Sequence, residues 1–196
     1  MSDWSELAAS VSSCTRCTEL AAARTHVVVG DFPAGARVLL VGEAPGAQED
    51  ASGRPFVGQA GRALDGALEA AGLPRARVAV LNILKCRPPG NRRPLAFETA
   101  NCRGWLDRQI TLIEPAVVVA LGLTAIGGLW DGAATAKKSA FVLRALREQE
   151  LTANGRRLVA TYHPSGALRY GPNGAPMQAL RDDLARARAI AAGDTP

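Results

Sequence analysis

The sequence lacks any long apolar run, and its first residues are acidic and polar. A membrane-spanning helix needs about 18 consecutive apolar residues, and a signal peptide begins with a basic segment followed by an apolar one. Neither pattern occurs in the 196 residues, and Met1 to Leu7 is acidic and polar. We therefore expect a cytoplasmic protein that does not bind membranes.

The sequence also lacks the two common phosphate-binding loops. Its clearest glycine-rich segment, Gly42-Glu-Ala-Pro-Gly46, is interrupted by Pro45 and does not match G-x-G-x-x-G. We expect no helix to begin at Gly46, and the lysine and hydroxyl of a P-loop are absent. Dinucleotide or nucleoside-triphosphate binding of these kinds is not predicted. No internal repeat is present either.

The composition is that of one compact domain. Hydrophobic residues make up 47% of the chain, and 20 residues are glycine. A chain of this length and composition can bury a single core. We expect one domain over residues 1–196, with no second domain, and a monomer.

Short apolar segments alternate with segments of helical periodicity. The apolar segments are rich in valine and leucine, which is typical of parallel strands buried on both faces. They span residues 37–41, 78–84, 116–121 and 157–162, and helices are predicted at 4–23, 60–71, 95–113, 124–129 and 175–192. The pattern predicts an α/β fold, a three-layer α/β/α sandwich around a mainly parallel four-stranded sheet.

Four cysteines form the set Cys14-x2-Cys17, Cys86 and Cys102. Disulfides are rare in the cytosol, and unrelated core cysteines would not include a C-x2-C pair, so a metal or cluster site is the leading interpretation. Zinc and an iron-sulfur cluster both accept four thiolates. A zinc ribbon normally has two C-x2-C pairs, and Cys86 and Cys102 lie too far apart for the second pair. The spacing favours a [4Fe-4S] cluster, with the N-terminal helix contributing two ligands.

Positive charge gathers in one proline-rich loop. The net charge is +5, and the segment from Lys85 to Pro94 carries four cations: Lys85, Arg87, Arg92 and Arg93. Its prolines exclude regular secondary structure. Such a loop next to Cys86 is a candidate surface for nucleic acid, and the alternative is a solvated loop without a ligand.

Chemically distinctive residues follow three of the predicted strands. Gly42 to Gly46 follows the first, Asn82 lies near the end of the second, and His163-Pro-Ser165 follows the last. Ligands of open α/β sheets bind at the carboxyl ends of the strands. We therefore expect the three segments to form one crevice.

These motifs, taken together, resemble family 4 of the uracil-DNA glycosylases, the iron-sulfur members of their superfamily. The resemblance rests on Gly42-Glu-Ala-Pro-Gly46, Glu49-Asp50, Gly53-Arg-Pro-Phe-Val-Gly58, Asn82, Lys85-Cys-Arg-Pro-Pro89 and Tyr162-His-Pro-Ser165, besides the four cysteines. It implies excision of uracil from single- or double-stranded DNA, a structural [4Fe-4S] cluster on Cys14, Cys17, Cys86 and Cys102, and no other cofactor. It also implies a bacterial-type cytoplasmic enzyme, associated with the nucleoid when bound to DNA.

The resemblance suggests which residues bind the flipped base. Phe56 is the candidate stacking platform, with an ordinary core phenylalanine as the alternative. Asn82 carries one donor and one acceptor, which match the O4 and N3-H edge of uracil and mismatch cytosine. Gly42 belongs to the same pocket. Glu49 matches the residue thought to exclude thymine, and a surface salt bridge is its alternative.

The same resemblance suggests how the bond is cleaved. His163 would donate a hydrogen bond to uracil O2, where negative charge develops, and His26 would belong to the fold. Glu43 would position the attacking water. Ala44 stands where the best-studied branch of the superfamily has an aspartate, so no second carboxylate shares this work.

DNA contacts are expected around the crevice, at Lys85, Arg87, Arg92, Arg93, Ser165, Leu168 and Arg169, with Lys137 and Lys138 as further candidates. Because Ala167 is small, Leu168 or Arg169 would have to fill the hole left by the flipped base. The alternatives are a non-catalytic DNA-binding module, a redox protein, and a protein that traps uracil-DNA covalently through a loop histidine. Residues 87–94 contain no histidine, which argues against trapping.

Overall fold

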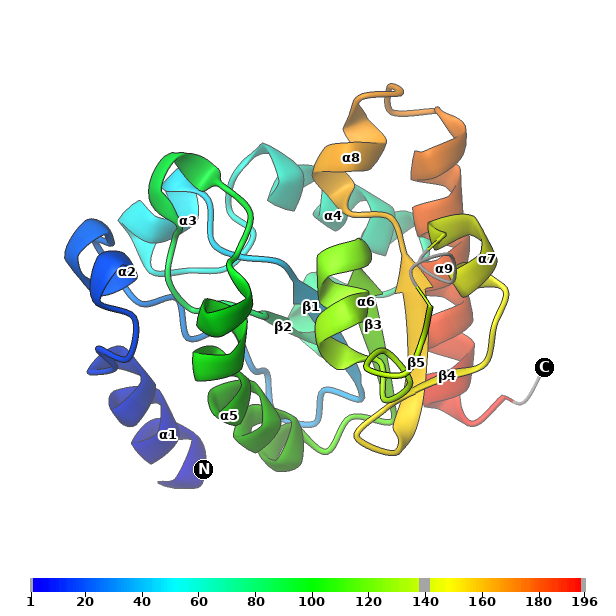
Figure 1. Cartoon of the computed structure of the whole chain (residues 1–196). Helices are drawn as coiled ribbons and strands as arrows, with labels where there is room; N and C mark the ends of the chain where they lie inside the picture. Colours follow the sequence, from blue (N-terminus) through cyan, green and yellow to red (C-terminus); the bar gives the residue numbers. More distant parts are fainter. Residues whose placement is uncertain (1, 138–141, 195–196) are drawn as a thin grey trace.

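The computed structural model describes residues 2–137 and 142–194, and it has a five-stranded sheet between two layers of helices (Figure 1). The strand order is β2-β1-β3-β5-β4, and the first four strands in this order are parallel. The strands are β1 (Val38–Gly42), β2 (Val78–Asn82), β3 (Val117–Leu121), β4 (Leu151–Ala153) and β5 (Arg156–Thr161). The predicted α/β sandwich with a mainly parallel sheet is confirmed.

The expected number of four strands is wrong, because β4 adds an antiparallel edge to β5. This strand has only three residues and buries alternate side chains, so it lacks the continuous apolar run of the other strands. The signal for it was Asn154-Gly155, a dipeptide typical of two-residue hairpin turns. Both residues adopt positive φ, 49° and 72°, as such a turn requires.

Nine α-helices surround the sheet within the described residues. They are α1 (Ser2–Ser12), α2 (Thr18–Ala23), α3 (Ala47–Ser52), α4 (Gln59–Ala70), α5 (Ala96–Ile113), α6 (Leu123–Leu129), α7 (Leu143–Arg147), α8 (Pro164–Leu168) and α9 (Ala175–Ala192). Two 3-10 turns, η1 (Arg75–Arg77) and η2 (Pro89–Asn91), complete the structure. The helices predicted at 60–71, 95–113, 124–129 and 175–192 correspond to α4, α5, α6 and α9.

The predicted single N-terminal helix is divided into α1 and α2. Cys14 lies in the break between them, and Cys17 is the N-cap residue of α2. The two cysteines are therefore held by a turn between helices, not by one continuous helix. A turn is the geometry that lets a C-x2-C pair direct both sulfurs to one point.

Two apolar clusters pack on opposite faces of the sheet. One contains Leu40 of β1 with residues of α4, α8 and α9, and the other contains Leu39 and Val41 with residues of α5, α6 and α7. The alternation follows from the two-residue period of a strand. Both faces are covered, which explains the apolar sequences of the strands. No helix in the described part of the chain is long and apolar enough to cross a bilayer.

Candidate active site

A crevice opens at the carboxyl ends of the parallel strands. It is lined by Glu43 after β1, by Leu121 and Gly122 at the end of β3, and by Tyr162 and His163 after β5. On the other side it is bordered by the basic loop, including Arg92 and Arg93. The exits of β1 and β5 line this crevice as predicted, whereas Asn82 is not among its lining residues; parallel pairing places Asn82 beside Gly42, at the same edge of the sheet.

The base of the site brings together an amide and an aromatic ring. Asn82, the last residue of β2, is only 2% exposed, and its Oδ1 has no hydrogen-bond partner among the described residues. A Cβ atom placed on Gly42 would lie 2.5 Å from Asn82 Oδ1 and 2.5 Å from Phe56 Cζ. Glycine at position 42 therefore allows the amide and the ring to lie this close to its backbone. Leaving a buried acceptor unpaired costs about 1–3 kcal/mol, which a ligand N–H could recover.

Phe56 is held in an unusual backbone conformation. Its φ is +53°, in the left-handed region that bulky residues rarely adopt, and its side chain is 6% exposed. Gly61 of α4 packs against it so closely that a Cβ atom there would collide with the Phe56 carbonyl. The Phe56 ring lies 5.8 Å from the His163 ring, centroid to centroid. The ring is thus fixed beside the crevice before any ligand arrives.

Glu49 fixes the loop that carries Phe56. Its Oε1 accepts hydrogen bonds from the backbone N–H groups of Val57 (2.9 Å) and Gly58 (2.8 Å), and its Oε2 accepts one from Gly46 (3.1 Å). Glu49 belongs to α3, which begins at Ala47, so the expectation that no helix starts at Gly46 is wrong. The Glu49 carboxylate therefore accepts three backbone hydrogen bonds, where a surface salt bridge was the alternative interpretation. These bonds join the glycine-rich segments that contain Gly46 and Gly58.

His163 is oriented by the first turn of α8. The Ser165 backbone N–H donates to His163 Nδ1 (3.3 Å), and the Ser165 hydroxyl lies 2.8 Å from the same nitrogen. Because Nδ1 accepts a backbone N–H, the ring proton of the neutral imidazole is on Nε2. Burial lowers the pKa of His163 below its ordinary value, although the charges of Glu43 and Glu49 oppose the shift. The imidazole is therefore a neutral donor at pH 7.

The Glu43 carboxylate faces the crevice without a protein partner. Among the described residues it has neither a hydrogen bond nor an ion pair, whereas its backbone carbonyl accepts from Leu84 N (3.1 Å). It is thus positioned by the backbone and free to bind water. His26, by contrast, places Nδ1 2.8 Å from the Asp50 carbonyl and belongs to the fold, as expected.

The cations around the crevice differ in whether their guanidinium groups are paired with other side chains. Arg93 and Arg169 are exposed, and their guanidinium groups have no partner within residues 2–137 and 142–194. Arg87 donates to Asn91 (2.8 Å). Arg92 makes a bidentate pair with the buried Glu98 (2.7 and 2.9 Å) and reaches Glu19 (3.2 Å). Arg92 is thus mainly a structural link, and Lys138 lies outside the described residues.

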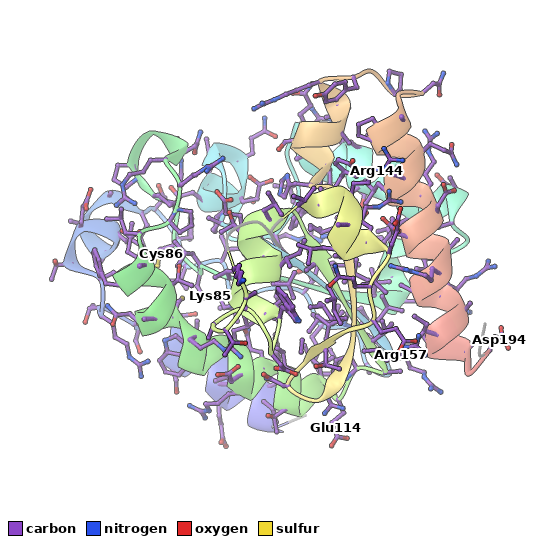
Figure 2. The ribbon with its side chains drawn as sticks, turned by 45° about the vertical axis from the view of Figure 1, so that its right-hand side comes forward. Lys85, Cys86, Glu114, Arg144, Arg157 and Asp194 are labelled. Atoms are coloured by element: carbon purple, nitrogen blue, oxygen red, sulfur yellow. The ribbon has the colours of Figure 1, made fainter. Side chains whose placement is uncertain are left out.

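Two predicted DNA contacts are corrected. The Lys85 side chain is 1% exposed, and Nζ donates to the Asn82 carbonyl (2.7 Å), so it does not reach DNA. Figure 2 shows Lys85 beside Cys86. Leu168 packs partly buried against the core. The exposed apolar side chain of this loop is Tyr170 (70% exposed), which the sequence analysis missed.

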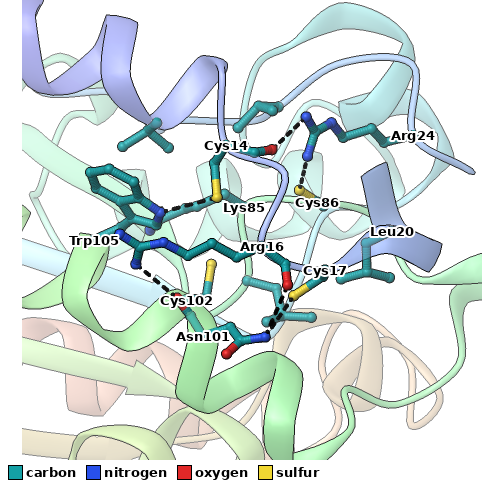
Figure 3. Close-up of a pocket in the computed structure, with 13 residues that line it drawn as sticks. Cys14, Arg16, Cys17, Leu20, Arg24, Lys85, Cys86, Asn101, Cys102 and Trp105 are labelled. Atoms are coloured by element: carbon teal, nitrogen blue, oxygen red, sulfur yellow. Dashed lines mark hydrogen bonds between the residues drawn. The ribbon is translucent and has the colours of Figure 1, made fainter. Parts of the chain in front are cut away.

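The four cysteines line one apolar cavity (Figure 3). Three sulfurs receive side-chain hydrogen bonds: Cys86 from Arg24 (3.0 Å), Cys14 from Trp105 (3.3 Å) and Cys17 from Asn101 (3.5 Å). These donors were not predictable from the cysteine spacing. Burial raises the pKa of the Cys86 and Cys102 thiols, and it lowers the pKa of Lys85 to about 8.

Comparison with known proteins agrees with this geometry. The model of the uracil DNA glycosylase superfamily matches residues 29–185. A type-4 uracil-DNA glycosylase of Thermotoga maritima is 41% identical over 163 residues, which cover 83% of this chain and 82% of the relative. One of Sulfurisphaera tokodaii is 37% identical over 189 residues, covering 92% and 81%. A type-5 enzyme of Pyrobaculum aerophilum is 36% identical over 148 residues, covering 66% and 62%.

The crevice, the fold and the family match together define a class. The chain belongs to the uracil-DNA glycosylase superfamily. Within that superfamily its similarity is to the type-4 enzymes, as the sequence motifs predict.

Proposed function

We propose that this uracil-DNA glycosylase takes uracil out of the DNA stack, hydrolyses the bond between uracil N1 and the sugar C1′, and leaves an abasic site. A base within a duplex cannot be reached, so it must enter the pocket unstacked. The observation that carries this proposal is the buried, unpaired Oδ1 of Asn82 opposite the Phe56 ring. An acceptor in that position fits uracil N3-H and opposes cytosine, whose N3 is itself an acceptor.

The residues around the pocket divide the chemistry between them. The glycosidic bond breaks with its electrons passing to uracil, and negative charge gathers at O2. His163 Nε2–H stabilises that charge as a neutral donor. Such a donor lowers the activation free energy by about 3–4 kcal/mol when it behaves like an oxyanion-hole group. Glu43 orients the water that attacks C1′ and accepts its proton. The uracil anion takes up a proton from solvent and departs as neutral uracil, Glu43 returns its proton to solvent, and the sugar retains the water oxygen as the C1′ hydroxyl.

Glu49 acts in this proposal through the loop that it holds. By fixing Gly46 and Gly58 it sets the position of Phe56 and the width of the pocket on the side facing uracil C5. A pocket of fixed width excludes the methyl group of thymine. Gly42 admits the ring by leaving the opposite wall without a side chain.

We further propose that Cys14, Cys17, Cys86 and Cys102 hold a [4Fe-4S] cluster that braces the segments around it. Support comes from the shared cavity, its apolar wall and the N–H donors to three sulfurs. The spacing of the four cysteines in the sequence, with one C-x2-C pair and not two, favours a polynuclear cluster over one zinc ion.

The DNA strand would lie across the basic rim. Arg93 and Arg169 are the free cations for its phosphates, Arg87 is a third, and Tyr170 can stack on a neighbouring base. Ser165 holds His163 and presents its exposed backbone turn to the strand. Either a single strand or a duplex can be bound in this way, by one copy of the chain. Because its substrate is DNA, we expect the enzyme to act in the cytoplasm, on the DNA there.

An oligonucleotide with a single uracil tests the proposal. We expect a strand break only after alkali, because the enzyme leaves an abasic site and makes no covalent adduct. Asn82→Ala should lose most of the activity and keep its cluster absorbance. An intact strand after alkali with the wild-type protein would refute the proposed glycosylase activity. A slowly migrating band that survives denaturation would show covalent trapping of the DNA.

A further inference from the structure

Lys85 is the only buried lysine or arginine among the residues that the structure describes. The buried carboxylates all have identified partners. Asp50 accepts from the backbone of residues 25 and 26, Glu98 pairs with Arg92, and Asp183 pairs with Arg147. For the Lys85 side chain, the one hydrogen bond found among the described residues is to the backbone carbonyl of Asn82, which carries no charge. A buried charge without compensation is costly, so its countercharge must come from another group.

The cysteines supply that charge. Lys85 lines the cavity that contains all four sulfurs. Figure 3 shows Lys85 among Cys14, Cys86 and Cys102. Four thiolates around a cluster leave net negative charge in this cavity, and Lys85 and Arg24 are the cations beside it.

The same ammonium group contacts the residue proposed to bind uracil. Nζ lies 2.7 Å from the carbonyl oxygen of Asn82, the residue whose amide is proposed to read the base. The intervening residues are fixed to the first motif, since Ile83 N donates to the Gly42 carbonyl (2.9 Å) and Leu84 N donates to the Glu43 carbonyl (3.1 Å). Lys85 therefore closes a short loop from Asn82 to the cysteine cavity.

We propose that Lys85 is a positioning residue that links the cysteine cavity to the uracil pocket. Its ammonium balances the negative charge around the sulfurs and, through the Asn82 carbonyl, sets the orientation of the Asn82 amide. The inference rests on the proposed function, because it takes Asn82 as the base-reading residue. It extends that function by making the state of the cavity a condition for uracil recognition.

The test compares two variants of the cluster-loaded protein. Lys85→Met removes the charge and the hydrogen bond to Asn82. Arg24→Gln removes a cation from the same cavity without touching Asn82, because Arg24 contacts Cys86 Sγ and the Cys14 carbonyl. We expect both variants to lower the midpoint potential of the cluster, since each removes positive charge near it. We expect Lys85→Met alone to lower the single-turnover rate of uracil excision, by about tenfold.

A third variant separates the two roles of Lys85. Lys85→Gln keeps an N–H donor, on a side chain one bond shorter, and removes the charge. It should lower the potential as Lys85→Met does and retain more excision activity than Lys85→Met. Binding to the same oligonucleotide without uracil should be unchanged in all three variants, because Lys85 does not face DNA.

An unchanged potential in Lys85→Met and Lys85→Gln would overturn the role in charge balance. Equal excision rates in Lys85→Met and Arg24→Gln would overturn the link to Asn82. Failure of the proposed function is distinguishable from both results, because the wild-type protein itself would then leave uracil in place.

Discussion

The substitution Gly42→Ala tests whether Asn82 and Phe56 form the base pocket. The added Cβ would lie 2.5 Å from Asn82 Oδ1 and from Phe56 Cζ, whereas ordinary contact begins near 3.4 Å. Each group would have to retreat by the difference, 3.4 − 2.5, or about 0.9 Å. The Phe56 backbone is packed closely against Gly61, so the displacement would fall on the ring and on the Asn82 amide.

A displacement of about 1 Å in a catalytic site can cost about a hundredfold in rate. We therefore expect the single-turnover rate of uracil excision to fall by about that factor. Overpacking of a buried site also costs about 1–3 kcal/mol, so the melting temperature should fall by several degrees. The rate must be measured well below the melting temperature of the variant, with cluster absorbance as the check on folding.

Gly66→Ala is the matched control. Gly66 lies in α4, and no heavy atom lies within 4 Å of a Cβ placed there. Its rate should equal that of the wild type, and its stability should be equal or slightly higher, because alanine favours a helix over glycine. A Gly42→Ala variant that retains the wild-type rate would refute the assignment of the pocket.

Three further predictions concern the histidine, the cations and the cysteines. The pKa of His163 in an NMR titration should lie below its ordinary value of 6.5, with the proton of the neutral ring on Nε2, because burial disfavours the charged ring. The contribution of His163 to stability is complete above pH 6.5 and is lost as the pH falls through the lowered pKa. A pKa at or above 6.5 would contradict this prediction. Arg93→Ala and Arg169→Ala should each reduce the slope of log K for duplex binding against log salt concentration by about 0.9, without lowering the melting temperature. Arg92→Ala should lower the melting temperature more than either variant, because it leaves the buried Glu98 unpaired. Cys102→Ala should abolish bound iron, which is expected at about four atoms per wild-type chain, and lower the melting temperature; zinc in place of iron in the wild type would refute the cluster.

The sequence identified the strands and most helices where a periodic pattern extends over several residues. The bounds of α9 were predicted to the residue, and β1, β2, β3 and β5 lie within the predicted segments or within one residue of them. The exceptions are short elements. β4 has three residues, and α3, α7 and α8 have five or six, which is too few for a helical period to be visible.

The site was predictable where a residue's position along the chain fixes its place. Residues at strand exits converge because parallel strands end at one edge; Glu43 and His163 thus line one crevice, and Asn82 pairs with Gly42 beside it. Side-chain direction was not predictable in the same way. Lys85 reads as one of four cations in a loop, and only its burial shows that it turns inward. Arg92 likewise reads as a DNA contact until its pairing with Glu98, six residues away, is seen.

The contact between Phe56 and Gly61 has a consequence for the order of events on DNA. The strained backbone at Phe56 is held by the packing of α4 and by the Glu49 carboxylate, so its free-energy cost is met during folding. The loop that carries Phe56 therefore needs little further ordering when a base enters. The free energy of stacking the base on Phe56 is then available to offset the cost of unstacking that base from the DNA duplex. The same ready-made pocket remains open to the free base after cleavage, so departure of uracil competes with its return. Turnover in this enzyme is thus tied to how quickly the product leaves a site that needs no rearrangement to hold it.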